Sequence, residues 1–288
     1  MTRLLLMLCL ALCASCATTA GTSSGKHAAA ASRESSPSAK SAVPLAGTST
    51  LAKVEAGKLL RVGVAINAPW VMHDKNGELF GYSIDLANKI GQDMGWRVEF
   101  VTTSWPRLLY DLRTNQFDVV VSGLSITPQR ALLARFSQPY GEYGIAVVMN
   151  RARYPKGGTR ELAAASGKRI AAHKGTLTAD VVRSRLPRAE IVEVDDEEQA
   201  IEDLRAGKFD GYAAEAPTPL LLEKIYPKQL RALSGDPLAR TAHGLAVRLD
   251  DRDLLDVLNA WIVDNKAAGW LDAREHYWFE TTEWASQL

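Results

Sequence analysis

The segment from Phe117 to Arg130, FDVVVSGLSITPQR, constrains the fold of this chain more than any other stretch. The unbroken β-branched run from Val119 to Val121 is typical of a strand that is buried on both faces of a parallel sheet. Gly123 follows that run closely. Thr127 and Pro128 then predict a helix, with the threonine as its cap and the proline in its first turn. A buried strand, a short loop and a helix are therefore expected here.

Polar groups gather in this loop, at the carboxyl end of the predicted strand, where open α/β sheets bind their ligands. Ser122 and Ser125 supply hydroxyls, and the guanidinium of Arg130 matches a carboxylate in a bidentate fashion. Arg130 is equally consistent with an ordinary exposed arginine in a first helical turn. The spacing alone allows an anion pocket and does not establish one.

The residues before this segment predict alternating strands and helices. Leu59 to Ile66 and Trp96 to Val101 have the pattern of strands, and Gly81 to Gly95 has the apolar periodicity of a helix, with Ser83 as its predicted cap. A short helix around Leu108 to Leu112 leads into the central strand. This β-α-β-α-β order, with its short connections, favours a parallel sheet.

The rest of the chain repeats the strand and helix pattern, which indicates an α/β protein with a second lobe inserted into the first. The predicted strands are 144–149, 168–172, 191–194, 209–213 and 244–248, and the predicted helices are one from Thr178, 197–204 and 254–270. We assign residues 51–147 and 240–288 to lobe 1 and residues 148–239 to lobe 2. The hinge then consists of two chain crossings, near residues 145–150 and 236–243.

The composition suits a soluble globular protein and argues against nucleic acid as a partner. The 288 residues are 47% apolar and 23% charged, and the formal net charge of +1 provides no basic field. The five histidines are scattered without ligand spacing, so we expect no metal site and no cofactor. Tryptophans near the C-terminus are expected to pack, and the protein is expected to be a monomer.

The N-terminus predicts export. Residues 1–16 have one arginine, an apolar run and then small residues, which together are typical of a secretory signal peptide. Ala14-Ser15-Cys16 resembles a lipoprotein lipobox, so Cys16 is expected to carry a lipid that anchors the chain in a membrane. Cleavage after Ala17 is the alternative. Residues 17–50 are rich in alanine, serine and threonine and are expected to form a flexible tether.

Several motifs in order resemble the bacterial extracellular solute-binding proteins of family 3, the polar amino-acid-binding components of ABC importers. They are GYSIDLA at 81–87, SGLSITPQR at 122–130, FSQPY at 136–140 and FDG at 209–211 followed by Glu215. The resemblance extends over about residues 58–280 and implies a type II periplasmic-binding fold, in which two lobes close over one ligand. Ser83 departs from the family, which usually has an acid at this position.

The resemblance also implies a binding site for the two charged ends of an amino acid. Arg130 would hold the α-carboxylate, helped by the amide of Ser125 and by Thr176, which follows Gly175 at a helix start. Glu215 would take the α-ammonium, together with the carbonyl of Gly123 and the hydroxyl of Ser125. Each lobe would then supply one charge, so that binding favours the closed state.

The side-chain pocket would be walled by Trp105 and by the NAPW loop from Asn67 to Trp70. The family often has an aromatic residue where this chain has Asn67, an acid at Val64 and a polar residue at Leu177. These departures favour a neutral, aromatic or amide side chain over a cationic one. The implied partners are the membrane subunits of an ABC importer, and the implied location is extracytoplasmic, in the periplasm or at the cell surface.

An enzymatic alternative rests on the same fold. Thr103 to Pro106 and Glu275 to Trp278 resemble the periplasmic cyclohexadienyl dehydratases, which act on prephenate or arogenate. Those enzymes carry a general acid about three residues after the acidic second-lobe position, which is Thr218 here, and a polar residue where this chain has Leu177. Both departures argue against the activity, so no catalytic residue is assigned. A ligand-sensing role is a further alternative.

Overall fold

The computed structural model describes residues 49–287. The predicted signal peptide, Cys16 and the predicted tether up to residue 48 lie outside the described residues. Helix α1 (Thr50–Gly57) begins the described part, and the side chain of Ser49 caps it by accepting a hydrogen bond from the amide of Ala52.

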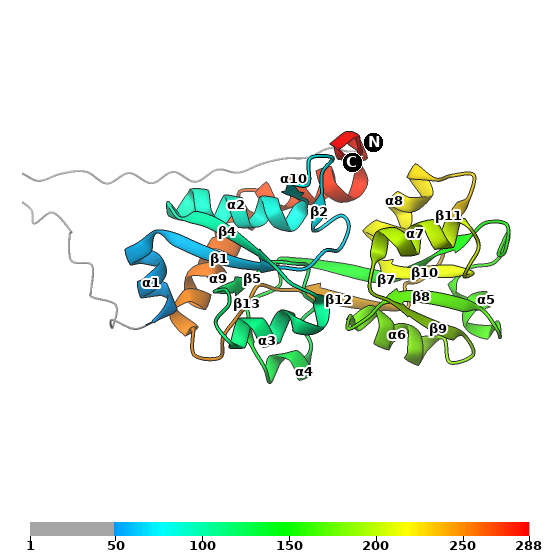
Figure 1. Ribbon diagram of the computed structural model, residues 1–288, viewed down its shortest axis with the longest axis horizontal. Coiled ribbons are helices and arrows are strands. Elements are labelled where there is room, and N and C mark those ends of the chain that lie inside the picture. Colours follow the sequence, from blue (N-terminus) through cyan, green and yellow to red (C-terminus); the bar gives the residue numbers. More distant parts are fainter. Residues whose placement is uncertain (1–48, 288) are drawn as a thin grey trace, which may run out of the picture. The chain divides into compact units, whose positions relative to one another are not determined.

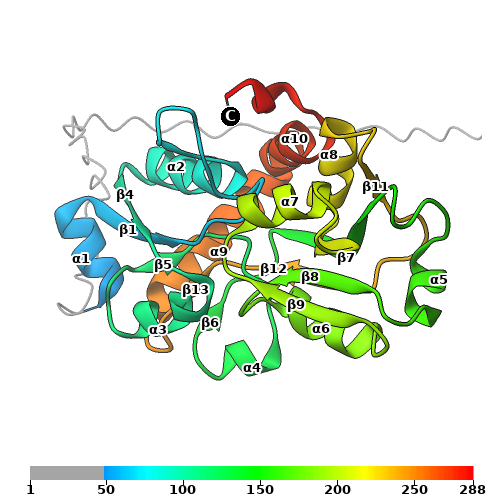
Figure 2. The same cartoon turned by 45° about the vertical axis from the view of Figure 1, so that its right-hand side comes forward.

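The first sheet has five strands in the order β4-β1-β5-β13-β6. Figure 1 labels the first four of them, and Figure 2 also labels β6. Their bounds are β4 (Arg97–Thr102), β1 (Leu59–Val64), β5 (Val119–Val120), β13 (Ala246–Val247) and β6 (Arg135–Phe136). Strand β1 pairs in parallel with β4 and β5, whereas β13 is antiparallel to β5 and β6. The parallel β-α-β-α-β arrangement predicted for residues 59–121 is confirmed.

Helices cover both faces of this sheet. They are α2 (Tyr82–Met94), the short helix η1 (Trp105–Arg107) that leads into α3 (Leu108–Arg113), and α9 (Arg252–Ala267). Figure 2 shows α2 above the strands and α3 below them. Val62 and Val119 are in one buried cluster with side chains of α2 and α9, whereas Val120 belongs to a second cluster with α3. Both faces of the sheet are therefore buried, as the valine run predicts.

The second sheet has the order β11-β7-β10-β8-β9, and β12 also pairs with β7. Its strands are β7 (Gly141–Asn150), β8 (Arg169–His173), β9 (Glu190–Val194), β10 (Gly211–Glu215), β11 (Leu230–Ala232) and β12 (Ala239–His243). Its helices are α5 (Thr159–Ala164), α6 (Leu177–Arg185), α7 (Glu197–Arg205) and α8 (Pro217–Ile225).

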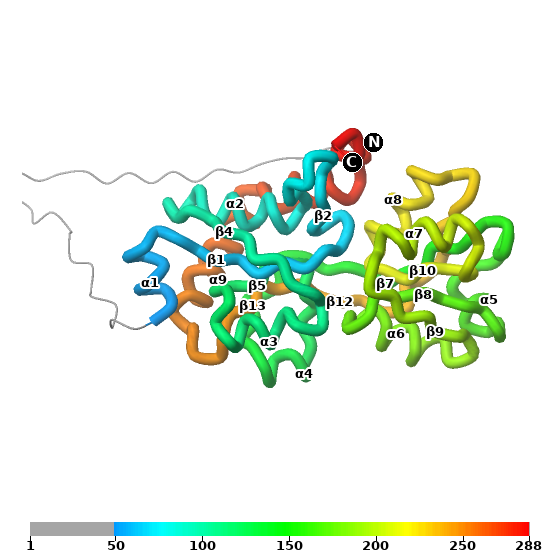
Figure 3. Tube along the Cα trace, viewed as in Figure 1, coloured from blue at the N-terminus to red at the C-terminus, as the bar shows by residue number. Residues whose placement is uncertain are grey.

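Two antiparallel strands, β7 and β12, carry the chain between the sheets (Figure 3). They are paired from Gly141 opposite His243 to Ile145 opposite Ala239. Beyond this stretch β7 continues along β10, and at the other end His243 forms a β-bridge with Ser125 in the loop after β5. The crossing strands therefore join the second sheet to the loop that follows the central strand of the first.

The remaining elements lie outside the two large sheets. In the chain they lie between strands of the first sheet or follow its last strand. They are the hairpin β2 (Met72–His73) and β3 (Leu79–Phe80), helix α4 (Pro128–Ala131), helix α10 (Trp270–Glu275), a π-helical turn η2 (His276–Glu280) and a final turn η3 (Glu283–Gln287). Trp261, Trp278 and Trp284 are buried in the first-sheet core, as expected from the sequence.

Two predicted helix boundaries were wrong. The cap of α2 is Gly81, not Ser83, because the amides of Tyr82 and Ser83 already donate to the carbonyls of Pro69 and Trp70. The predicted helix over 254–270 ends at Ala267, because Gly269 adopts a left-handed conformation (φ 71°) that starts α10 at a new angle.

Candidate ligand-binding site

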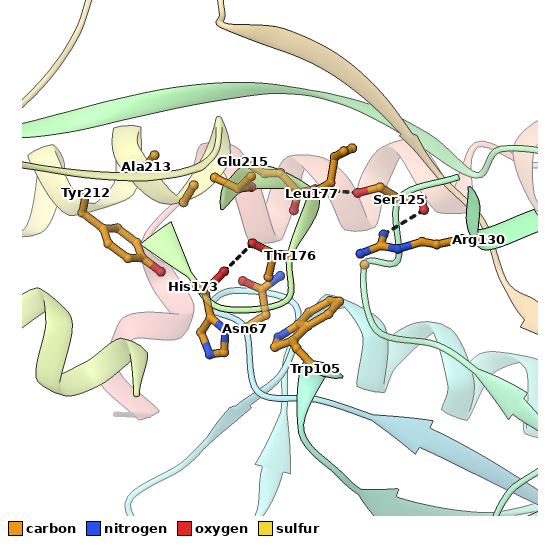
Figure 4. Close-up of a pocket in the computed structure, with 13 residues that line it drawn as sticks. Asn67, Trp105, Ser125, Arg130, His173, Thr176, Leu177, Tyr212, Ala213 and Glu215 are labelled. Atoms are coloured by element: carbon orange, nitrogen blue, oxygen red, sulfur yellow. Dashed lines mark hydrogen bonds between the residues drawn. The ribbon is translucent and has the colours of Figure 1, made fainter. Parts of the chain in front are cut away.

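One pocket is lined by residues from both sheets and contains most of the residues expected in a site (Figure 4). Its lining comprises Asn67, Trp105, Gly123, Ser125, Arg130, His173, Thr176, Leu177, Thr178, Tyr212, Ala213, Ala214 and Glu215. The loop after β5 and helix α4 supply Arg130, whereas Glu215 is the last residue of β10. The two opposite charges therefore come from different sheets.

Arg130 is positioned by the start of α4. Thr127 caps this helix by accepting a hydrogen bond from the Arg130 amide over 3.2 Å, as the sequence predicts. The guanidinium turns back along the loop, and Nη1 donates to the Ser125 carbonyl at 2.9 Å. Burial lowers the pKa of Arg130, against the opposing effect of Glu215. A guanidinium is so weak an acid that it stays charged in spite of this lowering, so Arg130 presents a half-buried cation.

Ser125 connects the two charged groups. Its carbonyl accepts from Arg130, while its hydroxyl lies 3.4 Å from Oε1 of Glu215 and donates to it (Figure 4). Gly123, two residues earlier, has a left-handed backbone (φ 63°) and lies against the Trp70 ring, which an added Cβ would approach to 3.1 Å. Glycine therefore lets this loop turn tightly at the edge of the pocket.

Glu215 is buried and has a partner that the sequence did not reveal. Its Oε1 lies 2.6 Å from Nε2 of His243, which is fully buried at the end of crossing strand β12. In the sequence, His243 is one of five scattered histidines, because its partner lies 28 positions away and only the fold brings the two together. The only local signal was that His243 directly precedes a predicted strand.

The second sheet also contributes the start of α6. Thr176 is the N-cap of this helix, accepting from the amide of Ala179 and donating to the carbonyl of His173 at 2.6 Å. Thr176 is therefore placed in the pocket, but its hydroxyl proton is used within the cap. A ligand carboxylate only accepts hydrogen bonds. A contact from Thr176 to it would therefore use the Thr176 amide, whose hydrogen bond to the His173 carbonyl is long at 3.4 Å, or the hydroxyl proton after it leaves that carbonyl.

Trp105 and Asn67 line the pocket from the first-sheet side. The Trp105 indole is held by a hydrogen bond from Nε1 to the carbonyl of Ile66 at 3.0 Å. Ala68, the next residue of the Asn67 loop, contacts two helices that accompany the second sheet. Its amide donates to Glu197 Oε2 on α7 at 2.8 Å, and Thr218 on α8 donates to its carbonyl at 2.7 Å. These contacts join the two sides of the pocket.

Trp70 and Gly175, which were expected in the site, are not among the lining residues of this pocket. Trp70 is fully buried behind Gly123, packed on Tyr143 and Phe279, because its loop turns inward toward the first-sheet core. Gly175 instead faces Pro106, whose ring an added Cβ would approach to 3.1 Å. The absence of a side chain at Gly175 lets the start of α6 lie close to Pro106, on the first-sheet side of the pocket.

A buried acid behind the pocket is the second feature that the sequence did not reveal. In the sequence, Glu197 is the first residue of the helix predicted over 197–204, where an acidic residue is ordinary. It accepts hydrogen bonds from the Tyr212 hydroxyl at 2.9 Å and from the Ala68 amide, and burial raises its pKa from 4.5 to about 7. Tyr212 therefore connects the pocket to a carboxyl group that can change charge near neutral pH.

Two further observations concern the described part of the chain. Residues 49–287 contain no group of three or more histidine, cysteine, aspartate or glutamate side chains that could hold a metal ion. Over the same residues, no helix combines the length and the apolar character needed to cross a membrane.

The fold and this two-sided pocket define an α/β solute-binding protein. Residues 60–281 match the family described as "Bacterial extracellular solute-binding proteins, family 3". The chain belongs to this family, and the resemblance found in the sequence is confirmed.

Three relatives match most of the chain. ABC transporter arginine-binding protein 1 of Escherichia coli (strain K12) is 28% identical over 228 residues, covering 78% of this chain and 92% of the relative. L-cystine-binding protein TcyJ of the same strain is 26% identical and covers 80% and 85%. Cyclohexadienyl dehydratase of Pseudomonas aeruginosa is 25% identical over 230 residues and covers 79% and 84%. The relatives thus include two binding proteins and one enzyme.

Solved structures agree with this assignment. The ancestral amino acid-binding protein AncCDT-1, a precursor of cyclohexadienyl dehydratase, matches with a TM-score of 0.74 at 29% identity, covering 80% of this chain and all of the other. A putative ABC transporter binding component from Wolinella succinogenes, complexed with lysine, also has a TM-score of 0.74, at 26% identity, covering 80% of this chain and 99% of the other. The type II periplasmic-binding fold expected from the sequence is therefore confirmed.

Proposed function

We propose that this protein captures one L-amino acid with an uncharged side chain and delivers it to an ABC importer. The observation that carries the proposal is the placement of Arg130 and Glu215 in one pocket, with Ser125 in contact with both. Arg130 is on helix α4, which follows first-sheet strand β5, and Glu215 ends second-sheet strand β10. A free amino acid carries one anionic and one cationic group, and a pocket with one fixed charge of each sign is complementary to it.

Each charged end of the amino acid has a proposed set of partners. Arg130 binds the α-carboxylate through its forked donors, with help from the Ser125 amide and from Thr176 at the start of α6. Glu215 binds the α-ammonium, together with the Gly123 carbonyl and the Ser125 hydroxyl. Asn67 and Trp105 contact the side chain.

The lining supports a preference for an uncharged side chain. Among the described residues that line the pocket, Glu215 is the one carboxylate, and it is assigned to the ammonium. Leu177, Tyr212 and Trp105 supply apolar or aromatic surface instead. A lysine or arginine side chain would bury a second cation without a fixed anion, which is costly. The preference therefore differs from that stated in the name of the arginine-binding relative.

The crossing strands β7 and β12 are proposed to act as the hinge between two lobes. Bending there would separate Arg130 from Glu215, and a ligand that contacts both residues would favour the closed arrangement. The contacts of Ala68 with Glu197 and Thr218 join the two sides of the pocket, and we propose that bending at the hinge breaks them.

Export and anchoring complete the proposal. We infer that residues 1–16 direct export, that Cys16 carries the lipid and that the monomeric binding protein works outside the cytoplasm. Replacing Cys16 with Ser is expected to move the protein from the membrane fraction to the soluble fraction. Continued membrane association of that variant would contradict the lipid anchor.

The dehydratase relative raises an enzymatic alternative, which the geometry does not favour. Thr218 stands where that group has its general acid, and its hydroxyl is committed to the Ala68 carbonyl. An alkyl hydroxyl is too weak an acid to serve as a general acid near neutral pH, so the proposal remains a binding function without catalysis.

A ligand screen tests this function. The full chain is unfolded and refolded to remove any carried ligand, and its melting temperature is followed with each L-amino acid, prephenate and arogenate. A ligand at one hundred times its Kd adds about 2.7 kcal/mol, which raises the melting temperature by roughly 5–10 °C. We expect this rise with one or a few neutral amino acids.

Variants make the screen specific to the site. Arg130→Ala should abolish the shift without changing the melting temperature of the free protein much, whereas Arg160→Ala, at an exposed position on α5, should leave the shift intact. Loss of the shift in both variants, or in neither, would contradict the assignment of Arg130. A larger shift with arginine than with any neutral amino acid would contradict the side-chain preference, and a shift with prephenate alone would favour the enzyme.

A further inference from the structure

The contact between His243 and Glu215 is built into the fold. His243 ends β12, where its backbone bridges to Ser125 and its carbonyl accepts a hydrogen bond from the Tyr140 amide at 3.0 Å. Its Nε2 lies 2.6 Å from Oε1 of Glu215. The imidazole is therefore fixed by the crossing strand at the point where the two sheets meet the pocket.

The other side of the ring faces aromatic groups. The His243 ring centroid lies 4.5 Å from that of Tyr143, 5.6 Å from that of Trp70 and 6.2 Å from that of Tyr140. Nδ1 is buried and has no hydrogen-bond partner among the described residues. One nitrogen of the ring is therefore paired with a carboxylate, and the other is enclosed without a partner.

This asymmetry decides where the proton lies. An imidazolium has two N–H donors, and the one on Nδ1 would be buried without an acceptor, which is a costly arrangement for a charged group. A neutral ring with its proton on Nδ1 would leave the same unpaired donor. A neutral ring with its proton on Nε2 donates to Glu215 and leaves only an unused lone pair at Nδ1.

We propose that His243 is a positioning residue, which holds the Glu215 carboxylate toward the ligand's α-ammonium by donating from Nε2 as a neutral imidazole. This inference rests on the proposed function. The hydrogen bonds from His243 and from Ser125 both reach Oε1, so Oε2 is the oxygen that meets the ammonium. A neutral donor orients Glu215 without cancelling the negative charge that the ammonium needs.

The test compares ligands that differ only in the ammonium. The probes are L-phenylalanine with 3-phenylpropanoate, L-glutamine with glutaramate and L-leucine with 4-methylpentanoate, titrated calorimetrically into the full chain. His243→Leu removes the donor, whereas His243→Gln keeps an N–H at similar reach. Thr241→Val is the matched control, because Thr241 lies on the same strand and its buried hydroxyl has no partner among the described residues.

His243→Leu is expected to weaken binding of the amino acids by about tenfold or more and to change binding of the des-amino carboxylates by less than about threefold. His243→Gln should recover amino-acid binding to within about threefold of wild type, and Thr241→Val should match wild type. Two results would overturn the proposal and show that His243 only packs. One is an equal loss of affinity for an amino acid and its des-amino carboxylate in His243→Leu, and the other is no recovery of amino-acid affinity in His243→Gln.

A second measurement needs no ligand and no variant. Nitrogen NMR of the ¹⁵N-histidine-labelled wild-type protein should show His243 with a protonated Nε2 and a bare Nδ1 at neutral pH. A proton on Nδ1, alone or together with one on Nε2, would overturn the proposal. Failure of the proposed function is seen separately in the ligand screen: no L-amino acid would raise the melting temperature of the wild-type protein, and Glu215 would then bind no ligand ammonium.

Discussion

The amide nitrogen of Ala68 donates a hydrogen bond to Oε2 of Glu197 across 2.8 Å, although the two residues are 129 positions apart. The carbonyl of the same residue accepts from the Thr218 hydroxyl at 2.7 Å. One residue of the loop after β1 is thus held through both of its backbone groups by side chains from helices α7 and α8. We call this set of contacts the Ala68 clasp. It connects the first-sheet side of the pocket to the second-sheet side.

The Ala68 clasp predicts a pH dependence of stability. Burial raises the pKa of Glu197 from 4.5 to about 7, so the folded protein binds this proton more tightly than the unfolded chain does. The stability contributed by this proton is fully present below pH 4.5 and is lost as the pH rises through 7. The difference amounts to about 3 kcal/mol in the free energy of unfolding.

Glu197→Gln isolates this effect, because glutamine keeps an acceptor for the Ala68 amide and cannot ionise. Urea unfolding should show that the free energy of unfolding of the variant, relative to that of wild type, rises by about 2.5 kcal/mol from pH 5 to pH 8. A constant difference between the two proteins across this range would show that Glu197 does not titrate there.

Thr218→Val tests the other half of the clasp. Valine has a similar shape and lacks the hydroxyl, so the Ala68 carbonyl loses one hydrogen bond, which is worth about 1 kcal/mol. If the clasp forms on closure, the affinity for the preferred amino acid should fall about fivefold. Calorimetric titration measures this change, and Thr241→Val again serves as the control. An unchanged affinity would mean that the clasp is equally formed with and without ligand.

Gly81 is predicted to be indispensable for the loop that carries Asn67 and Trp70. Its φ is 136°, and an added Cβ would lie 2.3 Å from the Trp70 carbonyl oxygen. Gly81→Ala should therefore lower the free energy of unfolding by more than about 2 kcal/mol. Gly77→Ala is the matched control, because Gly77 also has a positive φ of 84° and no atom lies within 4 Å of the added Cβ.

The control variant should lose only about 1 kcal/mol, the cost of the left-handed backbone. Denaturant unfolding of both variants provides the comparison. Similar losses in the two variants would mean that the close approach to Trp70 has no energetic consequence.

Local sequence signals predicted the parts of the site that depend on neighbours in the chain. Thr127 and Pro128 start α4 as expected, because a cap needs only an amide three residues away. The same reasoning failed for Ser83, since the first amides of α2 find carbonyls in the loop that contains Pro69 and Trp70. The residues next to Ser83 in the chain do not indicate that contact, because the carbonyls belong to a separate loop.

The features that the sequence did not reveal are pairs joined by the fold. In the sequence, His243 is one of several scattered histidines and Glu197 is an acidic residue at a predicted helix start. Neither indicates a site, because only the fold brings His243 to Glu215 and brings Glu197 to Tyr212 and Ala68. The family resemblance implied that Trp70 walls the pocket, whereas the turn at Gly81 packs its loop against the first-sheet core. Burial of a loop residue is decided by the elements around it.

The central claim is that Arg130 and Glu215 hold opposite ends of one amino acid. The most direct measurement is a crystal structure of the protein with the L-amino acid that raises its melting temperature most. We predict the α-carboxylate on the Arg130 guanidinium and the α-ammonium within hydrogen-bond distance of Glu215 Oε2, with His243 still on Oε1. An amino acid bound with its carboxylate away from Arg130, or outside the pocket that contains both residues, would contradict this account.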